Sequence, residues 1–248
     1  MSKTLLITGG SRGIGAAAAL LAAQRGWDVA VNYTRDAAAA QRVAEQVRAA
    51  GRRALVVQAD VADETQVLAM YATVDKEFGA LGGLVNNAGV VDMPARVDQM
   101  SLQRLMRMFA INLTGSFLCA REAVKRMSTR HGGTGGVIVN LSSAAARLGS
   151  PGQYVDYAAA KAGIDTFTLG LAREVATEGI RVNAVRPGII DTEIHASGGL
   201  PDRAKQTAPM VPMQRAGSAE EVAQAIVWLL SDDSSYTTGA VIDVTGGR

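Results

Sequence analysis

The sequence predicts an α/β fold built on a mainly parallel sheet of seven strands, and three observations support this. Short runs of β-branched and other apolar residues alternate with longer segments of helical periodicity, as in successive βαβ units. A glycine cluster joins the first run to the first helical segment. Neither an internal repeat nor a linker rich in proline and glycine divides the 248 residues, so we expect a single domain over 1–248.

The first half of the chain contains four of the expected strands. They are the apolar runs at 5–7, 29–33, 54–58 and 84–87. An alanine-rich segment over 13–25 and two amphipathic segments are expected as helices between them. The apolar residues of the amphipathic segments recur every three or four positions, as Val43, Val47 and Ala50 and then as Val67, Met70, Val74 and Phe78. This spacing places each set on one helix face, which we expect to be buried.

The second half supplies the other three strands, at 137–141, 181–185 and 240–244. We expect one or two helices over 102–127, a turn over 130–136, a helix over 155–178 and a helix over 219–230. The buried face of the helix over 155–178 would carry Ile164, Phe167, Leu171 and Val175. The stretch 187–217 is expected to be irregular, and its length is typical of a lid, which we place at about 190–217.

Composition excludes several classes of function. The 25 Lys and Arg against 23 Asp and Glu leave a formal charge of only +2 without a basic run, so no nucleic acid is expected as a partner. No apolar run approaches the roughly 20 residues of a membrane span, and the run at 5–7 is too short for a signal peptide. The single cysteine, Cys119, cannot form an internal disulfide. We expect a cytoplasmic protein without a structural metal.

The glycine cluster has the form of a phosphate-binding loop. Residues 8–15 read TGGSRGIG, with the spacing Gly-x3-Gly-x-Gly, between the first expected strand and helix. Gly9 would permit a tight turn, Gly13 would let the backbone approach a pyrophosphate, and Gly15 would let the helix pack on the strand. The helix N-terminus would offer free N–H groups to the anion. The loop therefore predicts a dinucleotide site.

The same residues also match a serine nucleophile elbow, because 9–13 read GGSRG. A serine hydrolase with Ser11 as nucleophile is therefore an alternative. Topology disfavours it, since the elbow borrows an oxyanion N–H from a loop after an earlier strand and only eight residues precede Gly9. The base would have to be His131, in the expected turn, or His195, in the irregular stretch.

Tyr157 and Lys161 lie four residues apart at the start of an expected helix, so they share one helix face. An ammonium about 6 Å from a phenol would lower the pKa of the phenol from about 10 toward neutrality. Such a pair alone is more often a solvated helix face. Its context is the end of the strand 137–141, where Ser142 and Ser143 follow, because ligands of open α/β sheets bind beyond the carboxyl ends of strands.

As a set, these features resemble the single-domain branch of the short-chain dehydrogenases/reductases from residue 4 to the end. The matching positions are 8–15, Asp60, Asn86-Asn87-Ala88-Gly89, Asn112, Ser143, Tyr157, Lys161 and Pro187-Gly188. The resemblance implies a Rossmann-type doubly wound sheet with helices on both faces and hydride transfer between a nicotinamide cofactor and a carbonyl or secondary alcohol. It extends to 3-oxoacyl carrier-protein reductases and to glucose or polyol dehydrogenases, so a 3-oxoacyl thioester, a sugar and a polyol stay open as substrates.

The resemblance also implies residue roles. Tyr157 would be the catalytic acid/base, Ser143 would hold the substrate carbonyl, and Lys161 would lower the tyrosine pKa and bind the nicotinamide ribose. Asn112 would help to hold a proton-relay water, and no metal is required. The expected cofactor contacts are Gly9, Ser11, Arg12, Gly13, Ile14, Gly15, Asn32, Tyr33, Arg35, Asp60, Val61, Asn87, Ala88, Gly89, Tyr157, Lys161, Pro187, Gly188, Ile190 and Thr192.

One spacing departs from this family. Its serine usually precedes the tyrosine by thirteen residues, where this chain has Ala144, whereas Ser143 stands fourteen before Tyr157. Alignment on the strand 137–141 favours Ser143 and leaves one extra residue within 149–156. Ser142 is the less favoured substitute.

The end of the second strand favours NADP(H) over NAD(H). An NAD site expects an acidic residue here, which binds the ribose hydroxyls, but residues 32–35 read NYTR. Arg35 and Arg12 would place two guanidiniums near a 2′-phosphate. Asp36 tempers this preference, so NAD(H) stays an alternative.

Two expectations concern assembly and activity. The helices within 105–127 and 155–178 are candidates to pair across a two-fold axis in a homotetramer, the common assembly in this family. The alternative in function is a nucleotide-sensing protein that has the fold but no turnover.

Overall fold

A computed structural model describes residues 3–248 of the chain. Within this range seven strands form one sheet in the order β3-β2-β1-β4-β5-β6-β7, and every neighbouring pair is parallel. The strands are β1 (Thr4–Ile7), β2 (Asp28–Tyr33), β3 (Ala54–Gln58), β4 (Gly83–Asn86), β5 (Gly136–Leu141), β6 (Ile180–Pro187) and β7 (Val241–Val244). The strand order reverses between β1 and β4, which makes the sheet doubly wound.

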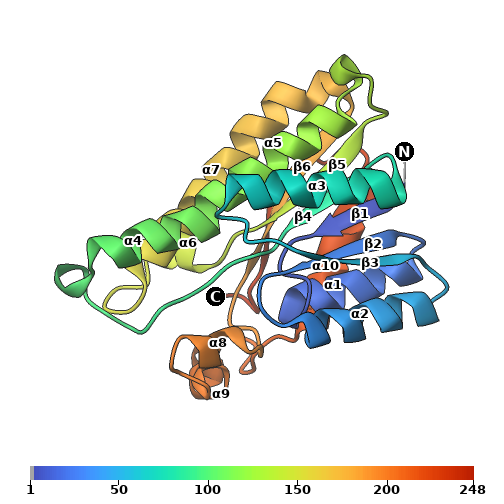
Figure 1. Ribbon diagram of the computed structural model, residues 1–248. Coiled ribbons are helices and arrows are strands. Elements are labelled where there is room, and N and C mark those ends of the chain that lie inside the picture. The colour runs from blue at the N-terminus through green and yellow to red at the C-terminus, as the bar shows by residue number, and fades with distance from the viewer. Residues whose placement is uncertain (1–2) are drawn as a thin grey trace.

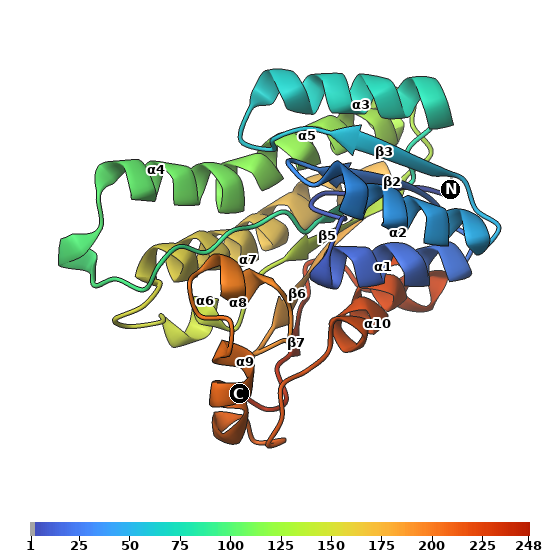
Figure 2. The ribbon, with the colours of Figure 1, turned by 60° about the horizontal axis from the view of Figure 1, so that its bottom comes forward.

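Long helices cover both faces of this sheet (Figures 1 and 2). One layer contains α1 (Gly13–Gln24), α2 (Ala37–Ala49) and α10 (Ala219–Leu230), and the other contains α3 (Glu64–Phe78), α5 (Gly115–Met127) and α7 (Val155–Val175). Alternate residues of each strand point to opposite layers. Leu5 and Ile7 pack in the first core, whereas Leu6 packs in the second. The predicted Rossmann-type fold is confirmed.

Four shorter helices complete the fold: α4 (Leu102–Phe109), α6 (Ala145–Leu148), α8 (Ile194–Ser197) and α9 (Arg203–Thr207). A π-helical turn over Ala110–Thr114 joins α4 to α5. The expectation that 187–217 is irregular is therefore wrong in part, because this stretch contains α8, α9 and a 3-10 turn at Ala208–Met210. Helices of four or five residues are too short to show an amphipathic period in the sequence.

Side-chain caps explain where several helices begin. Asp36 accepts a hydrogen bond from the N–H of Ala39 at 2.8 Å and starts α2, and Asp63 caps α3 in the same manner. Val43 and Val47 are buried as expected, but Ala50 is exposed because it lies beyond the last turn of α2. The buried-face prediction was wrong at that residue.

The helix expected over 155–178 ends as an α-helix at Val175, and its last three residues form a 3-10 turn. Ile164 and Val175 are buried, while Phe167 and Leu171 are only half-buried. Phe167 stacks on Phe117 of α5, with 3.7 Å between the ring centroids. The α5 and α7 faces that carry these rings thus lie side by side, away from the sheet.

The carboxyl ends of β1, β4 and β5 meet where the strand order reverses. The glycine loop follows β1, residues 87–89 follow β4, and the serine pair follows β5. The chain from β6 onward then passes through α8 and α9, near the same edge (Figure 2). The described helices include none that is both long enough and apolar enough to cross a bilayer.

Candidate active site

The glycine loop is a strained turn that leaves the start of α1 uncapped. Gly9 has a φ of +61°, a conformation that side chains disfavour. At Gly15, a Cβ atom would lie 2.5 Å from Nδ2 of Asn87 and 2.6 Å from the Gly9 carbonyl oxygen, so only glycine fits. No side chain caps α1 at Arg12, and its first turn has no acidic residue. The first N–H groups of α1 are therefore available to an anion, as a phosphate site requires.

Thr8 and Asn87 connect this loop to the end of β4. The Thr8 hydroxyl accepts hydrogen bonds from the backbone N–H groups of Asn87 and Ala88, each at 3.0 Å. The Asn87 amide in turn donates to the carbonyls of Thr8 and Gly9, each at 2.9 Å. These contacts hold the loop against β4 and fix the width of the cleft between β1 and β4.

Asn32, at the end of β2, supports the loop from below. Its side chain is buried, accepts from the N–H of Gly9 at 3.1 Å and donates to the Ala59 carbonyl at 3.0 Å. Its amide is thus committed to the protein. Tyr33 is half-buried, whereas Arg12 and Arg35 are exposed and, within residues 3–248, form no ion pair.

The end of β3 lies beside the same cleft. Asp60 is half-buried, and its carboxylate accepts from the N–H of Ala62 at 2.9 Å. Val61 is buried against Gly115, where a Cβ atom would come within 2.7 Å of the valine methyl group. This close approach packs the start of α5 against the segment that follows β3.

One cavity of about 440 Å³ lies at the carboxyl edge of the sheet and brings several of the predicted residues together. Its lining includes Ile14, Asn87, Gly89, Ser142, Ser143, Tyr157, Lys161, Pro187, Gly188, Ile190 and Thr192. Ser11 and Gly13 are not part of this lining, but Gly13 faces Thr192, since a Cβ atom on Gly13 would lie 3.4 Å from that side chain.

Ser143 and Tyr157 both line this cavity, and the nearby Ser143 hydroxyl lowers the pKa of the Tyr157 phenol. Ser142 instead turns its hydroxyl into the protein, where it donates to the Lys161 carbonyl at 3.1 Å. Ala144 carries no hydroxyl group. The geometry therefore favours Ser143 over its neighbours.

Lys161 lies close to Tyr157, with Nζ 5.6 Å from the ring centroid, but its ammonium donates to the Leu141 carbonyl at 2.6 Å. Burial lowers the pKa of Lys161 to about 8. Burial also raises the pKa of Tyr157, and the Ser143 hydroxyl and the charge of Arg203 offset this only in part. The expectation that Lys161 brings the Tyr157 pKa toward neutrality is wrong for this structure, because desolvation of the phenolate dominates.

Asn112 lies in the π-helical turn and is fully buried. Its amide oxygen accepts from the N–H of Val90, and its amide nitrogen donates to the carbonyls of Val90 and Met108, each at 3.0 Å. Gly89 makes room for it, since a Cβ atom there would lie 2.9 Å from the Asn112 oxygen and 3.6 Å from Nζ of Lys161. Asn112 thus holds the segment after β4 beside the lysine.

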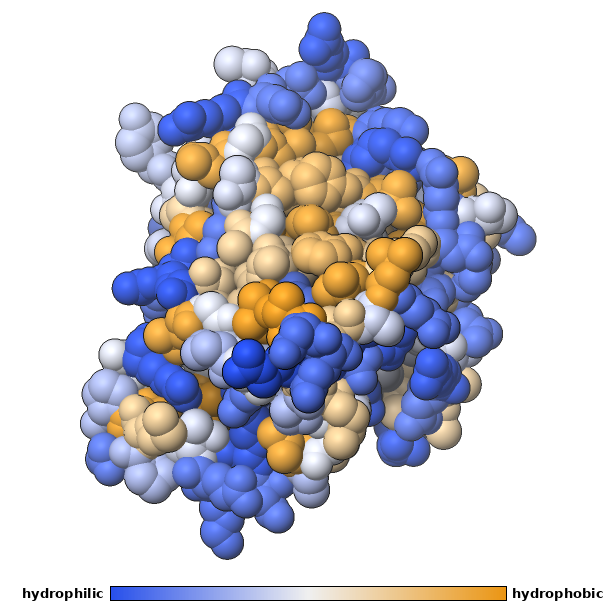
Figure 3. Space-filling view, turned by 90° about the vertical axis from the view of Figure 1, so that its left-hand side faces the viewer, coloured by the Kyte–Doolittle hydropathy of each residue, from blue (hydrophilic) through white to orange (hydrophobic). Residues whose placement is uncertain are grey.

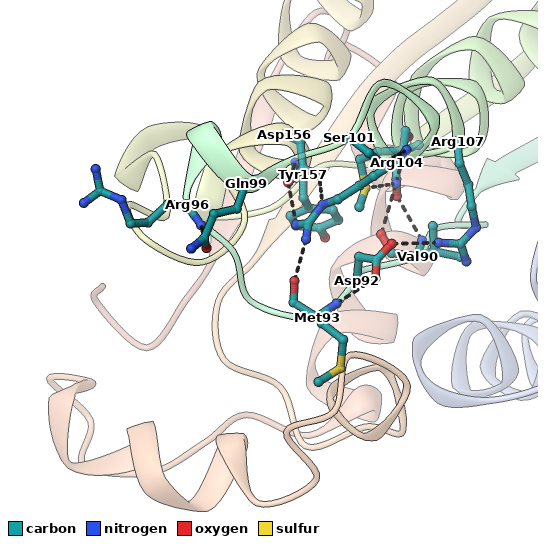
Figure 4. A network of polar contacts seen from close by, with 12 residues as sticks. Val90, Asp92, Met93, Arg96, Gln99, Ser101, Arg104, Arg107, Asp156 and Tyr157 are labelled. Atoms are coloured by element: carbon teal, nitrogen blue, oxygen red, sulfur yellow. Dashed lines mark hydrogen bonds and ion pairs between the residues drawn. The ribbon is translucent and has the colours of Figure 1, made fainter.

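Beneath Tyr157 lies an ion pair that sequence reasoning did not identify (Figure 4). Arg104 of α4 pairs with Asp156 through Nε–Oδ2 at 2.7 Å and Nη2–Oδ1 at 3.3 Å. Asp156 also accepts from the Tyr157 backbone N–H at 2.9 Å, and Arg104 donates to the Met93 carbonyl at 2.6 Å. The pair joins residues 52 positions apart, and no spacing pattern in the sequence predicts it.

The hydrolase alternative lacks a base for Ser11. His131 precedes the amino end of β5, at the opposite edge of the sheet from the glycine loop. His195 is buried, and its Nε2 is hydrogen-bonded to the Ile190 carbonyl at 2.8 Å. Burial also lowers the pKa of His195 below its ordinary value. Neither histidine is placed to activate Ser11.

Comparisons with known proteins show what this chain is similar to. The family model described as enoyl-(acyl carrier protein) reductase matches residues 9–248. The uncharacterized oxidoreductase YgfF of Escherichia coli (strain K12) is 58% identical over 243 residues, 98% of both chains. The 3-oxoacyl-(acyl-carrier-protein) reductase FabG of Staphylococcus aureus is 40% identical, over 100% of this chain and 98% of that protein. A short-chain dehydrogenase from Burkholderia cenocepacia, solved in complex with NADP, superposes with a TM-score of 0.90 at 32% identity, over 99% and 98% of the two chains.

Proposed function

The chain belongs to the short-chain dehydrogenase/reductase family and is an NAD(P)-dependent oxidoreductase acting on CH–OH groups, and we propose that Tyr157 is its catalytic acid/base. The observation that carries this proposal is that Ser143, Tyr157 and Lys161 line one cavity, which Ile14 at the start of α1 lines as well. When bound, a nicotinamide cofactor would supply or accept the hydride.

The side chains of the cavity would do the remaining chemistry. The hydroxyls of Ser143 and Tyr157 hold the substrate oxygen between them, and Tyr157 donates its proton to that oxygen during reduction. The raised pKa of Tyr157 keeps the phenol protonated at neutral pH, which suits a general acid. Oxidation of an alcohol reverses these transfers and requires the phenolate. Lys161 and Asn112 hold the backbone around the reacting groups through Leu141 and Val90.

The residues around the glycine loop fit a dinucleotide, and we propose that it is NADP(H). The uncapped N-terminus of α1 would bind the pyrophosphate. Arg12 and Arg35 have no ion-pair partner within residues 3–248, so both are free to bind a 2′-phosphate. Asp36 directs its carboxylate to the N–H of Ala39 as the cap of α2, which weakens the argument for NAD(H). Asp60 and Val61 would line the adenine side.

The substrate would enter beneath residues 190–217, which we propose as the lid. Ile190 and Thr192 would contact the nicotinamide end of the cofactor, since both line the cavity and Thr192 faces the glycine loop. A 3-oxoacyl thioester, a sugar and a polyol are the candidate substrates, and proteins similar to this chain include one named a 3-oxoacyl-(acyl-carrier-protein) reductase and one named a glucose 1-dehydrogenase. The former is 40% identical to this chain.

An apolar face favours assembly into a homotetramer. Figure 3 shows apolar side chains gathered on the side of the molecule that carries α4, α5 and α7. The exposed apolar residues of these helices include Leu102, Met106, Phe117 and Leu169. A patch of this kind on parallel helices is typical of a two-fold interface. Sedimentation equilibrium that gives a monomer at micromolar concentration would contradict this assembly.

A panel assay tests the enzymatic proposal against a nucleotide sensor without turnover. NADPH oxidation is measured with ketones, aldehydes and 3-oxoacyl thioesters, and NADP reduction with sugars and polyols. We expect turnover with at least one substrate class. Tight NADPH binding without turnover across the panel would favour the sensor. A cytoplasmic location belongs to the same proposal, and the buried, unpaired Cys119 is consistent with it.

A further inference from the structure

The charged side chains that line the catalytic cavity, within the described residues, are all basic. Besides Lys161 they are Arg203, from α9 of the proposed lid, and Arg248, and no aspartate or glutamate contributes to the lining. His195 also lines the cavity, with its pKa lowered by burial. A concave site with one sign of charge attracts ligands of the opposite sign. This excess is not explained by hydride or proton transfer.

Arg203 is held in place by neutral partners only. Its Nη2 donates to Oε1 of Gln153 at 3.0 Å, and its guanidinium lies over the ring of Tyr154, 4.9 Å from the centroid. No ion pair joins it to a carboxylate within residues 3–248. A guanidinium oriented in this way has unused donors, and its planar fork matches a carboxylate or a phosphate.

The neighbouring arginines behave differently. Arg147 pairs with Asp243, Arg186 pairs with Asp165 and Asp243, and Arg215 pairs with Glu221. These three arginines are therefore neutralised by carboxylates of the protein itself. Arg203, on α9 beside Tyr154, has no such carboxylate partner within residues 3–248.

Arg248 supplies a second unsatisfied donor at the same cavity. Its Nη1 atom is buried and has no hydrogen-bond partner, although the residue is only half-buried as a whole. A buried donor without a partner costs folding free energy, and a ligand oxygen would satisfy it. Two independent groups thus point to the same ligand chemistry.

We propose that the substrate carries an anionic group, a carboxylate or a phosphate, on the side of the reacting carbonyl that faces α9, where Arg203 binds it. Arg248 adds positive charge to the lining of the same cavity. This inference rests on the proposed function and narrows its substrate class, because a neutral sugar or polyol would leave both guanidiniums without a counter-ion. The position of Arg203 on the proposed lid would also couple binding of the anion to the position of α9.

Matched substrate pairs test this inference. The initial-rate kcat/KM with NADPH is measured for 4-oxopentanoate against its methyl ester, and for dihydroxyacetone phosphate against dihydroxyacetone. The first pair reports on a carboxylate and the second on a phosphate. We expect the anion of at least one pair to be preferred by tenfold or more. Equal or better turnover of the neutral member in both pairs would overturn the inference.

Two variants locate the effect. Arg203→Gln is expected to abolish the preference for the anion, measured as the ratio of kcat/KM for the two members of a pair, while Arg203→Lys retains part of the preference. Lys205→Gln, which removes an exposed positive charge from the same short helix, is expected to retain the full preference. Equal losses for both members of a pair in Arg203→Gln would mean that Arg203 only supports the lid, and would reject the inference.

A binding measurement separates this inference from the proposed function. Titration calorimetry with pentanoate and with inorganic phosphate is performed on the NADPH-saturated protein and on Arg203→Gln. We expect one of the two anions to bind the parent protein and to lose at least tenfold in affinity in the variant. If neither ketone pair turns over but this difference is observed, the proposed reaction fails and the anion site stands. If turnover is observed without any dependence on Arg203 in either assay, the reaction stands and the anion site fails.

Discussion

The guanidinium of Arg104 and the carboxylate of Asp156 form a buried, two-point ion pair, and the same carboxylate accepts the backbone N–H of Tyr157. The side chain of Asp156 is inaccessible to solvent and that of Arg104 is 11% exposed. The pair therefore couples α4 to the first turn of α7, where the proposed acid lies (Figure 4). Because the Asp156 carboxylate contacts the backbone of Tyr157, we expect the ion pair to affect catalysis by positioning this tyrosine.

Removal of one partner leaves the other charge buried and uncompensated. We expect Arg104→Gln to lower the free energy of unfolding by about 3 kcal/mol. The control is Arg107→Gln on the same helix, because Arg107 is exposed and pairs at 3.2 Å with Asp92, which is only half-buried. That variant should change stability by less than about 1 kcal/mol. Urea denaturation of both measures the difference, and equal effects would contradict a structural role for the buried pair.

The choice between the two serines is open to a matched comparison. Ser143 faces Tyr157, whereas Ser142 donates to the Lys161 carbonyl. We expect Ser143→Ala to lower kcat by about 10² because the substrate oxygen loses a hydrogen-bond donor in the transition state. The factor by which Ser142→Ala lowers kcat should be at least ten times smaller than the factor for Ser143→Ala. Steady-state kinetics with the same ketone decide this, and the reverse order of the two effects would assign the role to Ser142.

Burial of Lys161 predicts a pH-dependent stability difference. Its folded pKa of about 8 lies below its ordinary value of 10.5, so the unfolded chain binds more protons between these pH values. The stability cost of burying the charge is complete below pH 8 and declines as the pH rises toward 10.5. We expect Lys161→Met to be more stable than the parent by about 2–3 kcal/mol at pH 7, and by less than about 1 kcal/mol at pH 10.

Urea denaturation of both proteins at the two pH values measures this change. Taking the difference between parent and variant removes the contribution of the other titrating groups. A stability difference that is the same at pH 7 and pH 10 would show that the ammonium is not desolvated in the folded state.

The preference for NADP(H) rests on Arg12 and Arg35. Each replacement by alanine removes one guanidinium from the site of the 2′-phosphate, and we expect each to reduce the ratio of kcat/KM for NADPH over NADH by tenfold or more, about 1.4 kcal/mol. Arg42→Ala, an exposed arginine farther along α2, is the control and should leave the ratio unchanged. A parent protein with higher kcat/KM for NADH would contradict the assignment.

Much of this fold was predictable because local periodicity and sheet topology agree. Alternation of strand and helix patterns indicated the parallel sheet, and the carboxyl ends of β1, β4 and β5 then had to share one edge. The exposure of Ala50 and the short helices α8 and α9 were not predicted. The apolar pattern does not fix the end of a helix to within one turn, and helices of this length show no period. Motif order brought Ser143, Tyr157 and Lys161 to one cavity, as expected from their elements.

Interactions between distant residues were not predictable in this way. The pairing of Arg104 with Asp156, and the place of Arg203 over Tyr154, depend on how α4 and α9 pack against α7 and the turn before it. The pKa of Tyr157 depends on the balance between burial and nearby charge, which a four-residue spacing does not determine. The contacts that position Tyr157 and the charges near it therefore came from the structure and not from the motifs.

The central claim, that Tyr157 transfers the proton, is tested most directly by Tyr157→Phe. The variant keeps the ring that is packed beside Lys161 and removes only the hydroxyl. With any ketone that the parent reduces, we expect kcat to fall by 10² or more while the Kd for NADPH, measured by cofactor fluorescence, stays within about threefold. Tyr236→Phe, at a fully exposed tyrosine, controls for the substitution itself. Near-normal turnover by Tyr157→Phe with NADPH bound would contradict the account.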